Sequence, residues 1–317
     1  MSVITATPAV SVRTFRGPGI TSRVIALPLT MLVRPVIAVF GRSALAPWPF
    51  RMVDHVARIL PAPRNTVRTR IALPRAAAEF LVPPTADSTS ASAILYVHGG
   101  GLLVGGLNTH RLLAADIANA AGEVVLAIDY RMPPRSTVDD AVTDVLDGLR
   151  ELLSRGYRAE NIAVVGDSAG AFIGAVAIAR AQQEHMGRVR SFVAMSPVAT
   201  LTEVVRARSR RKDAMFTHAA IAAMKTRVRR AGGSIPELLD DPEALSSLPR
   251  TLIQTGEDEL LSADAYALAS ALTEAHVSCE LQSWRGQFHV FQAAAPVSAP
   301  ARAAVAEIGA FLRATRP

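Results

Sequence analysis

Residues 161–171 read NIAVVGDSAGA, and this stretch decides the fold. It begins with β-branched and small apolar residues typical of a buried strand, and an apolar segment long enough for a helix follows it. Gly166 and Gly170 flank Ser168 at two-residue spacing, which lets the backbone bend sharply between strand and helix. The stretch therefore predicts a strand, a tight turn and a helix, with a serine hydroxyl at the turn.

A serine on such a turn can act as a nucleophile, because the N–H groups and dipole of the following helix favour negative charge beside it. The Gly-x-Ser-x-Gly pattern is short, however, and a chain rich in glycine and alanine can contain it by chance. A catalytic role for Ser168 therefore depends on finding its partners elsewhere in the chain.

The chain has 317 residues, half of them hydrophobic, which suits one large α/β domain or two small ones. Its single cysteine, Cys279, excludes an intrachain disulfide framework. The net charge of +7 comes mostly from arginine, but the arginines are scattered and aromatic residues make up only 5%. This composition argues against nucleic-acid binding and favours solvated charged faces with some attraction to an anionic surface. The basic run 206–212 and the basic residues up to Arg230 are the candidate site of such a contact.

Residues 24–40 form a candidate membrane segment. Pro28, Arg34 and Pro35 interrupt it, and it falls short of the ~18 to 20 continuous apolar residues that a transmembrane helix needs. A polar leader precedes it and no clear cleavage site follows, so we predict neither a transmembrane helix nor a signal peptide. An amphipathic helix that covers a pocket or rests on a membrane surface fits better. We expect a cytoplasmic protein or one bound peripherally to the membrane or cell envelope.

The sequence pattern changes near residue 60, which predicts a boundary there. Residues 1–60 predict a helical cap segment with a break near Arg34-Pro35. Residues 61–317 predict one catalytic domain, which opens with antiparallel edge strands near 67–72 and 78–82 and continues with alternating strands and helices. This alternation requires crossover connections and a mostly parallel sheet with helices on both faces. An insertion at about 200–248, with a helix at 218–230, is expected to lie over the C-terminal strand ends as a second cap piece.

The nucleophile needs a base and a carboxylate, and in this type of sheet they follow Ser168 on loops after later strands, in the order acid, then histidine. His289 lies on a loop after the last expected strand, and we predict it as the base. The acid comes from Glu257, Asp258 or Glu259, which follow the strand at 251–255. We favour Asp258, because a short stem is easily locked against an imidazole.

Acyl transfer also needs backbone N–H groups aimed at the developing oxyanion. The run from His98 to Gly101 follows a continuous apolar strand, and three consecutive glycines indicate close approach of the backbone to a ligand. We predict an oxyanion hole formed by the N–H groups of Gly99, Gly100 and Ala169. A phosphate-binding loop is disfavoured because no lysine and Ser/Thr pair follows at the required spacing.

Together these motifs resemble the hormone-sensitive-lipase-like family of α/β-hydrolases, which includes many bacterial carboxylesterases and lipases. The motifs appear in the family's order between residues 93 and 292. They are His98-Gly99-Gly100-Gly101, Asp129-Tyr130-Arg131, Gly166-Asp167-Ser168-Ala169-Gly170, Ser196-Pro197, Gly256-Glu257-Asp258-Glu259-Leu260 and Phe288-His289-Val290-Phe291.

The resemblance implies an α/β-hydrolase fold with a mostly parallel eight-stranded sheet, and a cap built from the N-terminus and the insertion. It also implies hydrolysis of short- to medium-chain acyl esters by Ser168, Asp258 and His289, with Asp167 as a structural partner of the turn or a wall of the pocket. Two departures stand out. Residues 132–136 replace a loop that usually carries a further carboxylate, and Leu102-Leu103 stand where an aromatic residue is common.

The main hypothesis is therefore a serine carboxylic ester hydrolase that works through an acyl-enzyme and needs no metal or cofactor. A ligand-binding protein without catalysis on the same fold, and an amide or lactone hydrolase, are the alternatives. The expected partner is a small-molecule ester. Contact with a membrane or anionic surface and a homodimer are further predictions.

Overall fold

The computed structural model describes residues 10–17, 19–41, 50–59, 63, 65–86, 91–201 and 213–317. The basic run 206–212, a predicted contact with anionic surfaces, lies outside the described residues, as does part of the predicted cap insertion. Within the described ranges, none of the helices has both the length and the apolar character that a membrane crossing requires.

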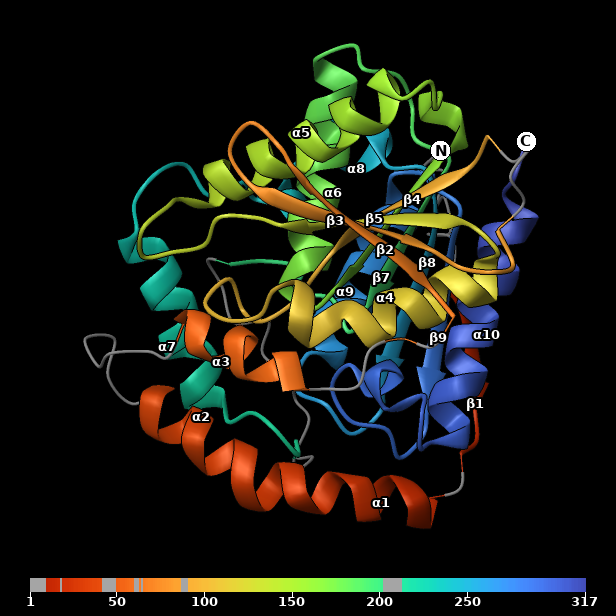
Figure 1. The fold of residues 1–317 in the computed structure, drawn as a ribbon. Coiled ribbons are helices and arrows are strands. Elements are labelled where there is room, and N and C mark those ends of the chain that lie inside the picture. The colour runs from red at the N-terminus through yellow and green to blue at the C-terminus, as the bar shows by residue number, and fades with distance from the viewer. Residues whose placement is uncertain are drawn as a thin grey trace, which may run out of the picture.

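A twisted sheet runs through the centre of the molecule, and helices cover both of its faces (Figure 1). Its strand order is β1-β9-β8-β7-β6-β4-β5-β3-β2. Strand β3 pairs antiparallel with β2 and β5, and the other neighbours are parallel. The strands are β1 (Ser11–Phe15), β2 (Val67–Ala72), β3 (Ala77–Val82), β4 (Ala93–Val97), β5 (Val124–Asp129), β6 (Ile162–Asp167), β7 (Ser191–Met195), β8 (Arg250–Gly256) and β9 (Cys279–Trp284).

The α/β-hydrolase fold with a mostly parallel sheet is confirmed, and β1 adds a ninth strand that the sequence did not indicate. Strand β1 lies parallel to β9 at the edge of the sheet. Phe15 stacks on Trp284 with 4.1 Å between ring centroids, and Arg13 pairs with Glu280 and Glu307. These contacts join residues that are more than 260 positions apart, so no local pattern could reveal them.

Strand β4 shows how the sheet separates two apolar layers. Successive side chains of a strand point to opposite faces. Leu95 and Val97 pack in the cluster that holds α5, α6 and α9, while Ile94 and Tyr96 pack with α4 and α10. The helices of the two layers are α4 (Leu107–Ala121), α5 (Val138–Ser154), α6 (Ala169–Gln183), α9 (Ser262–Glu274) and α10 (Ala299–Ala314).

The helices of the cap region come from both parts of the chain predicted to form it. The N-terminal part contributes α1 (Gly19–Pro28), the π-helical segment η1 (Leu29–Val33), α2 (Arg34–Gly41), α3 (Phe50–Val56) and η2 (Ala57–Ile59). The insertion contributes α7 (His218–Arg230). Its later helices, η4 (Leu238–Asp240) and α8 (Pro242–Ser247), pack against α6 and α9 instead, so the prediction that the whole insertion lies over the C-terminal strand ends is wrong for this part. The remaining short helices are η3 (Ala159–Asn161) and η5 (Phe291–Ala294).

Helices α1 and α2 form one rod along the outer edge of the molecule (red in Figure 1). The predicted break near Arg34-Pro35 is a change of helix type: the chain widens into the π turn, and the N–H of Arg34 donates to the carbonyl of Leu29. Helix α7 packs beside α2. The division of the chain at residue 60 stays a prediction.

Asp54 attaches α3 to the catalytic domain. Its Oδ1 accepts hydrogen bonds from the backbone N–H groups of Asn108 and Thr109, both at 2.9 Å, and its Oδ2 accepts one from the Asn108 amide at 2.7 Å. The carboxylate thus satisfies free N–H groups in the first turn of α4, as a capping residue does. Because these hydrogen bonds outweigh its partial burial, the pKa of Asp54 lies below its ordinary value.

Candidate active site

Ser168 lies at the sharp turn between β6 and α6. Its backbone has φ 52° and ψ −123°, a conformation that costs energy for a residue with a side chain. The flanking glycines make the turn possible. A Cβ at Gly170 would lie 2.2 Å from the carbonyl oxygen of Val97, and one at Gly166 would lie 2.7 Å from backbone atoms of Gly170. The predicted strand, turn and helix are therefore present, with the hydroxyl at the N-terminus of α6.

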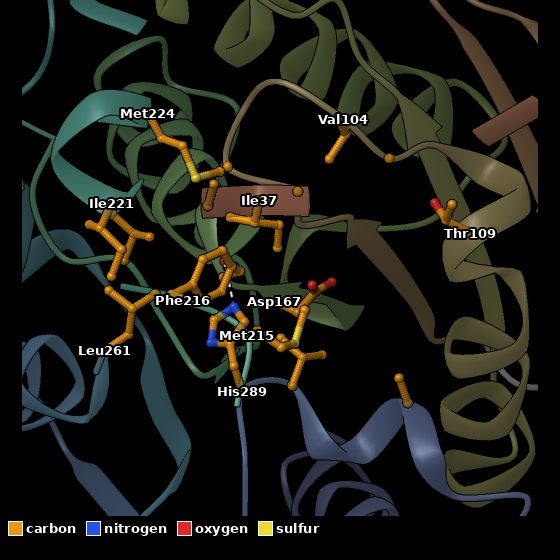
Figure 2. Close-up of a pocket in the computed structure, with 18 of the residues that line it drawn as sticks. Ile37, Val104, Thr109, Asp167, Met215, Phe216, Ile221, Met224, Leu261 and His289 are labelled. Atoms are coloured by element: carbon orange, nitrogen blue, oxygen red, sulfur yellow. Dashed lines mark hydrogen bonds between the residues drawn. The ribbon is translucent and has the colours of Figure 1, made fainter. Parts of the chain in front are cut away.

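His289 meets the serine, as the sequence predicts. Its Nε2 atom lies 3.0 Å from Oγ of Ser168, and a dashed line at His289 marks this hydrogen bond (Figure 2). Both side chains are buried. The loop that carries it is held in place by Val290, whose N–H donates to Oγ of Ser196 at 3.0 Å. Phe216 packs edge-on against the imidazole, with ring centroids 5.0 Å apart. The serine and the histidine, 121 residues apart in the chain, thus form one polar pair.

The carboxylate behind the histidine belongs to Glu259. Its Oε2 atom lies 2.6 Å from Nδ1 of His289, and its side chain is fully buried. The prediction that Asp258 occupies this position is wrong. The Asp258 main chain instead donates its N–H to the carbonyl of Gln287 at 3.0 Å.

The turn after β8 explains why the acid is Glu259. Its Oε1 atom accepts hydrogen bonds from the Thr255 hydroxyl at 2.6 Å and from the Gly256 N–H at 2.8 Å. The carboxylate therefore folds back onto its own strand end, while Oε2 remains directed at the histidine. The longer stem of glutamate makes this reversal possible. The short stem of aspartate and the position of Asp258 two residues after Gly256 therefore favoured the wrong neighbour.

Glu259 also sets the protonation of His289. Burial favours the neutral ring, but the hydrogen bond and the charge of Glu259 outweigh burial and raise the pKa of His289 above its ordinary value. A carboxylate at Nδ1 holds the proton on that nitrogen and leaves Nε2 free to accept the serine proton.

The glycine loop after β4 lies against Ser168. A Cβ at Gly99 would lie 2.2 Å from Oδ2 of Asp167 and 3.0 Å from Cβ of Ser168, so only glycine fits there. Gly100, with φ 112°, and Ala169 line the same pocket as Ser168. The structure therefore brings all three predicted oxyanion-hole residues around the serine. Their role in binding an oxyanion stays a proposal.

A buried polar cluster of Tyr96, His110 and Asp167 packs against this loop. The Asp167 carboxylate accepts a hydrogen bond from the Tyr96 hydroxyl at 2.6 Å and lies 3.5 Å from Nε2 of His110. Burial by itself would raise the pKa of Asp167, but His110 and Tyr96 hold it below its ordinary value. Asp167 also lines the pocket, so it has both of the roles that the resemblance implies for it.

His98 braces the first glycine. Its Nδ1 lies 2.7 Å from the carbonyl oxygen of Gly99, and the Tyr130 hydroxyl donates to the carbonyl of His98 at 2.8 Å. Burial and the nearby charge of His110 lower the pKa of His98 to about 4, so its ring is neutral. Nδ1 is then the donor to Gly99.

The loop at 132–136, which departs from the family pattern, has support from α5. The buried Asp144 carboxylate accepts the backbone N–H of Arg131 at 2.8 Å and pairs with the Arg131 guanidinium at the same distance. The other departure, Leu102-Leu103, lies away from the pocket wall. Leu102 and Leu103 are fully buried, and neither is among the described residues that line the pocket.

A pocket of about 530 Å³ leads to Ser168. Most of its wall is apolar, with side chains from the N-terminal helices, the insertion and the loops around the serine (Figure 2). Leu29 of η1, Ile37 of α2 and Val53 of α3 come from the N-terminal helices, and Ile221 and Met224 come from α7. Both parts predicted to form a cap therefore contribute to the wall. Among the described residues, no group of three or more His, Cys, Asp or Glu side chains is placed to hold a metal.

Sequence reasoning missed two acids here. Glu259 was named but set aside. Asp213, in the insertion, is buried, and its carboxylate accepts N–H groups from Met215 and Phe216 at one oxygen and from Leu260 at the other. It thus ties the segment that carries Phe216 to the loop that carries Glu259. Its only sequence signal was its place just after the basic run.

Comparison with known proteins shows the family to which the chain belongs. The model of the alpha/beta hydrolase fold family matches residues 94–293. The chain is 38% identical over 296 residues to esterase LipU of Mycobacterium tuberculosis, covering 89% of this chain and 99% of LipU. It is 34% identical over 308 residues to the carboxylesterase/phospholipase LipF of that organism, covering 94% of this chain and 82% of LipF.

A solved structure of an esterase from the bacterial hormone-sensitive lipase family superimposes with a TM-score of 0.75 at 29% identity, covering 89% of this chain and 97% of that one. The sequence resemblance, the family match and the fold thus agree. The chain belongs to the α/β-hydrolase fold family and, within it, to the hormone-sensitive-lipase-like esterases, and it is an enzyme of the carboxylesterase/lipase class.

Proposed function

We propose that the protein hydrolyses carboxylic esters through a serine-bound acyl-enzyme. The observation that carries the proposal is the continuous hydrogen-bonded chain from Ser168 through His289 to Glu259, with distances of 3.0 and 2.6 Å. The proposed chemistry of these three side chains requires no metal or cofactor.

The reaction follows from the positions of these groups. Nε2 of His289 accepts the hydroxyl proton while Oγ of Ser168 attacks the ester carbonyl. Glu259 stabilises the imidazolium that forms. The histidine then gives the proton to the departing alcohol, which leaves an acyl group on Ser168. Water attacks this ester in the second half, His289 takes one of its protons, and the carboxylic acid departs as the serine regains its proton.

The N–H groups of Gly99, Gly100 and Ala169 are proposed to bind the carbonyl oxygen as it becomes negative. The close packing of Gly99 against Ser168 and the place of Gly100 and Ala169 on the pocket wall support this role. Loss of one such donor typically lowers the rate by about 100- to 1000-fold.

The apolar wall of the pocket supports the proposal that the preferred substrates are esters with acyl groups of short to medium length. The pocket volume of about 530 Å³ suits a small molecule. Amide or lactone hydrolysis would use the same residues, and a binding protein without catalysis would need the pocket but not the His289 to Glu259 pair.

The test is hydrolysis of p-nitrophenyl esters from two to sixteen carbons by the unmodified chain, Ser168→Ala and the control Ser154→Ala. Ser154 is exposed at the end of α5. We expect Ser168→Ala to lose about four to six orders of magnitude in kcat, while Ser154→Ala retains activity. Folded protein that hydrolyses none of the series and resists a fluorophosphonate probe at Ser168 would refute the proposal.

Three further predictions stay predictions. They are peripheral contact with a membrane or anionic surface, a homodimer, and a location in the cytoplasm or at the cell envelope.

A further inference from the structure

The exposed side of the N-terminal helical rod is apolar between positions 24 and 39. Every exposed residue between positions 24 and 39 is apolar. They are Val24, Leu27, Pro28, Met31, Leu32, Pro35, Val36 and Val39. Their spacing of three and four residues places them on one side of the rod, over about 24 Å at the ordinary helical rise.

This face is unusual for a helix in water. A surface helix normally places charged and polar residues opposite its buried stripe. Here the opposite side is apolar as well, since Leu29 and Ile37 line the pocket beneath the rod. Met31 and Leu32 each expose about two thirds of their surface, at 65% and 68%. A continuous exposed apolar surface of this kind marks an interaction site.

The next helical segment also exposes apolar side chains. Met52 and Val56 of α3 and Ile59 of η2 are exposed, the last at 84%. Helix α3 shares the pocket wall with the rod through Val53. The exposed apolar side chains therefore surround the elements that roof the pocket, rather than a remote part of the molecule.

Beside Ile59 lies a hollow rich in arginine. Arg58, Arg68, Arg70 and Arg111 line it together with a single acid, Glu79. Glu79 is buried and pairs with Arg111 at 2.6 Å and Arg70 at 3.6 Å. Within the part of the chain that the structure describes, no acid pairs with the exposed Arg58 or Arg68. The hollow thus carries an excess of positive charge next to the apolar surface.

An exposed apolar helical face together with an arginine-rich hollow beside Ile59 matches the chemistry of a bilayer surface that carries anionic headgroups. We propose that the outer face of α1, η1 and α2, with the exposed residues of α3 and η2 and the arginine hollow, docks the enzyme on an anionic lipid surface. The apolar side chains enter the boundary of the acyl chains, and Arg58 and Arg68 contact phosphate groups. Docking would bring the helices that cover the pocket against the lipid. The inference that this contact delivers ester substrates to Ser168 rests on the proposed function.

The experiment is sedimentation of the full chain with vesicles of phosphatidylcholine alone, or with about one quarter phosphatidylglycerol. We expect binding to the mixed vesicles that weakens about tenfold or more in Leu27→Glu/Leu32→Glu, because two charges would have to enter the apolar boundary. The matched control is Tyr266→Glu on α9, which packs on the opposite face of the sheet. This control should bind as the unmodified chain does.

The arginine part is tested separately. Arg58→Gln/Arg68→Gln should weaken binding to the anionic vesicles about 5- to 30-fold and leave binding to neutral vesicles unchanged. Equal binding to both vesicle types by the unmodified chain would overturn the role of the hollow. No binding to either type, or full binding by Leu27→Glu/Leu32→Glu, would overturn the docking surface.

A second copy of the chain is the competing occupant. Sedimentation velocity without lipid tests it: a dimer that Leu27→Glu/Leu32→Glu converts to a monomer would overturn the lipid assignment. Turnover of dissolved p-nitrophenyl butyrate should be the same in that variant and the unmodified chain, which also shows that the variant folds. Vesicle binding without any ester turnover would refute the proposed function and leave the docking surface standing.

Discussion

Oε2 of Glu259 lies 2.6 Å from Nδ1 of His289, although Glu259 stands among three consecutive acidic residues of which any could follow the strand into the site. The same carboxylate is bound at its other oxygen by the end of its own strand, through the Thr255 hydroxyl and the Gly256 N–H. This double attachment distinguishes Glu259 from its two acidic neighbours.

Replacing Glu259 with glutamine tests that distinction. The amide cannot stabilise an imidazolium, and it can present its NH₂ group to Nδ1, which would place the histidine proton on the wrong nitrogen. We expect kcat for p-nitrophenyl butyrate to fall about 10³- to 10⁴-fold. Asp258→Asn is the matched control and should stay within about twofold of the unmodified enzyme. The reverse ranking would restore Asp258 as the catalytic acid.

The pH dependence of kcat/KM follows from the raised pKa of His289. The reaction needs the neutral ring, so activity is lost as pH falls through that pKa. Because Glu259 raises this pKa, the midpoint of the acid limb should lie above the ordinary histidine value of about 6.5. In Glu259→Gln the residual activity should have its acid limb at lower pH. An unchanged midpoint in the variant would show that Glu259 does not set the protonation of the base.

Gly99→Ala probes the packing of the glycine loop. Its Cβ would meet Asp167 at 2.2 Å and the Cβ of Ser168 at 3.0 Å, which displaces the predicted oxyanion donors. We expect kcat/KM to fall at least about 100-fold. Gly156→Ala is the control, since its Cβ would meet nothing within 4 Å. Its positive φ of 92° should cost about 1 kcal/mol of stability and no activity. Thermal unfolding and ester turnover, measured on both variants, separate strain from lost chemistry.

A buried charge cluster away from the active site should contribute strongly to the free energy of unfolding, which urea denaturation measures. Glu123 is fully buried and binds Arg190 and Arg316, each at 2.8 Å. Glu123→Ala leaves the almost fully buried Arg190 without its counter-charge and should cost about 3–5 kcal/mol. Glu151→Ala, which breaks an exposed pair with Arg155, should cost at most about 0.5 kcal/mol. Similar losses in the two variants would contradict this account.

Asp54 provides a pH-dependent attachment of α3. Its lowered pKa means that its contribution to stability is present above the unfolded pKa of aspartate and is lost as pH falls toward the folded value. Asp54→Ala should therefore lower the unfolding free energy by about 0.5–2 kcal/mol at neutral pH. The difference from the unmodified chain should shrink in acid. A difference that does not change with pH would mean that the carboxylate charge is not what holds the helix.

Much of the core could be predicted from local patterns. The strand at 93–97 and the helix at 218–230 have the bounds that the sequence indicates, because each is a short run whose apolar pattern and flanking residues agree. Strand β1 could not be predicted, since its stabilising partners, Trp284 and Glu280, lie at the other end of the chain.

The sequence by itself determined which serine and which histidine meet in the site. Ser168 stands between two glycines at a strand-to-helix junction, and His289 follows the last strand, so chain order and local geometry were enough to name both. Only the tertiary structure decided the acid, because three adjacent carboxylates are chemically alike until the turn after β8 directs one of them at the imidazole. It also decided which N-terminal residues wall the pocket and which face outward, since helical periodicity alone cannot distinguish two apolar sides of one helix.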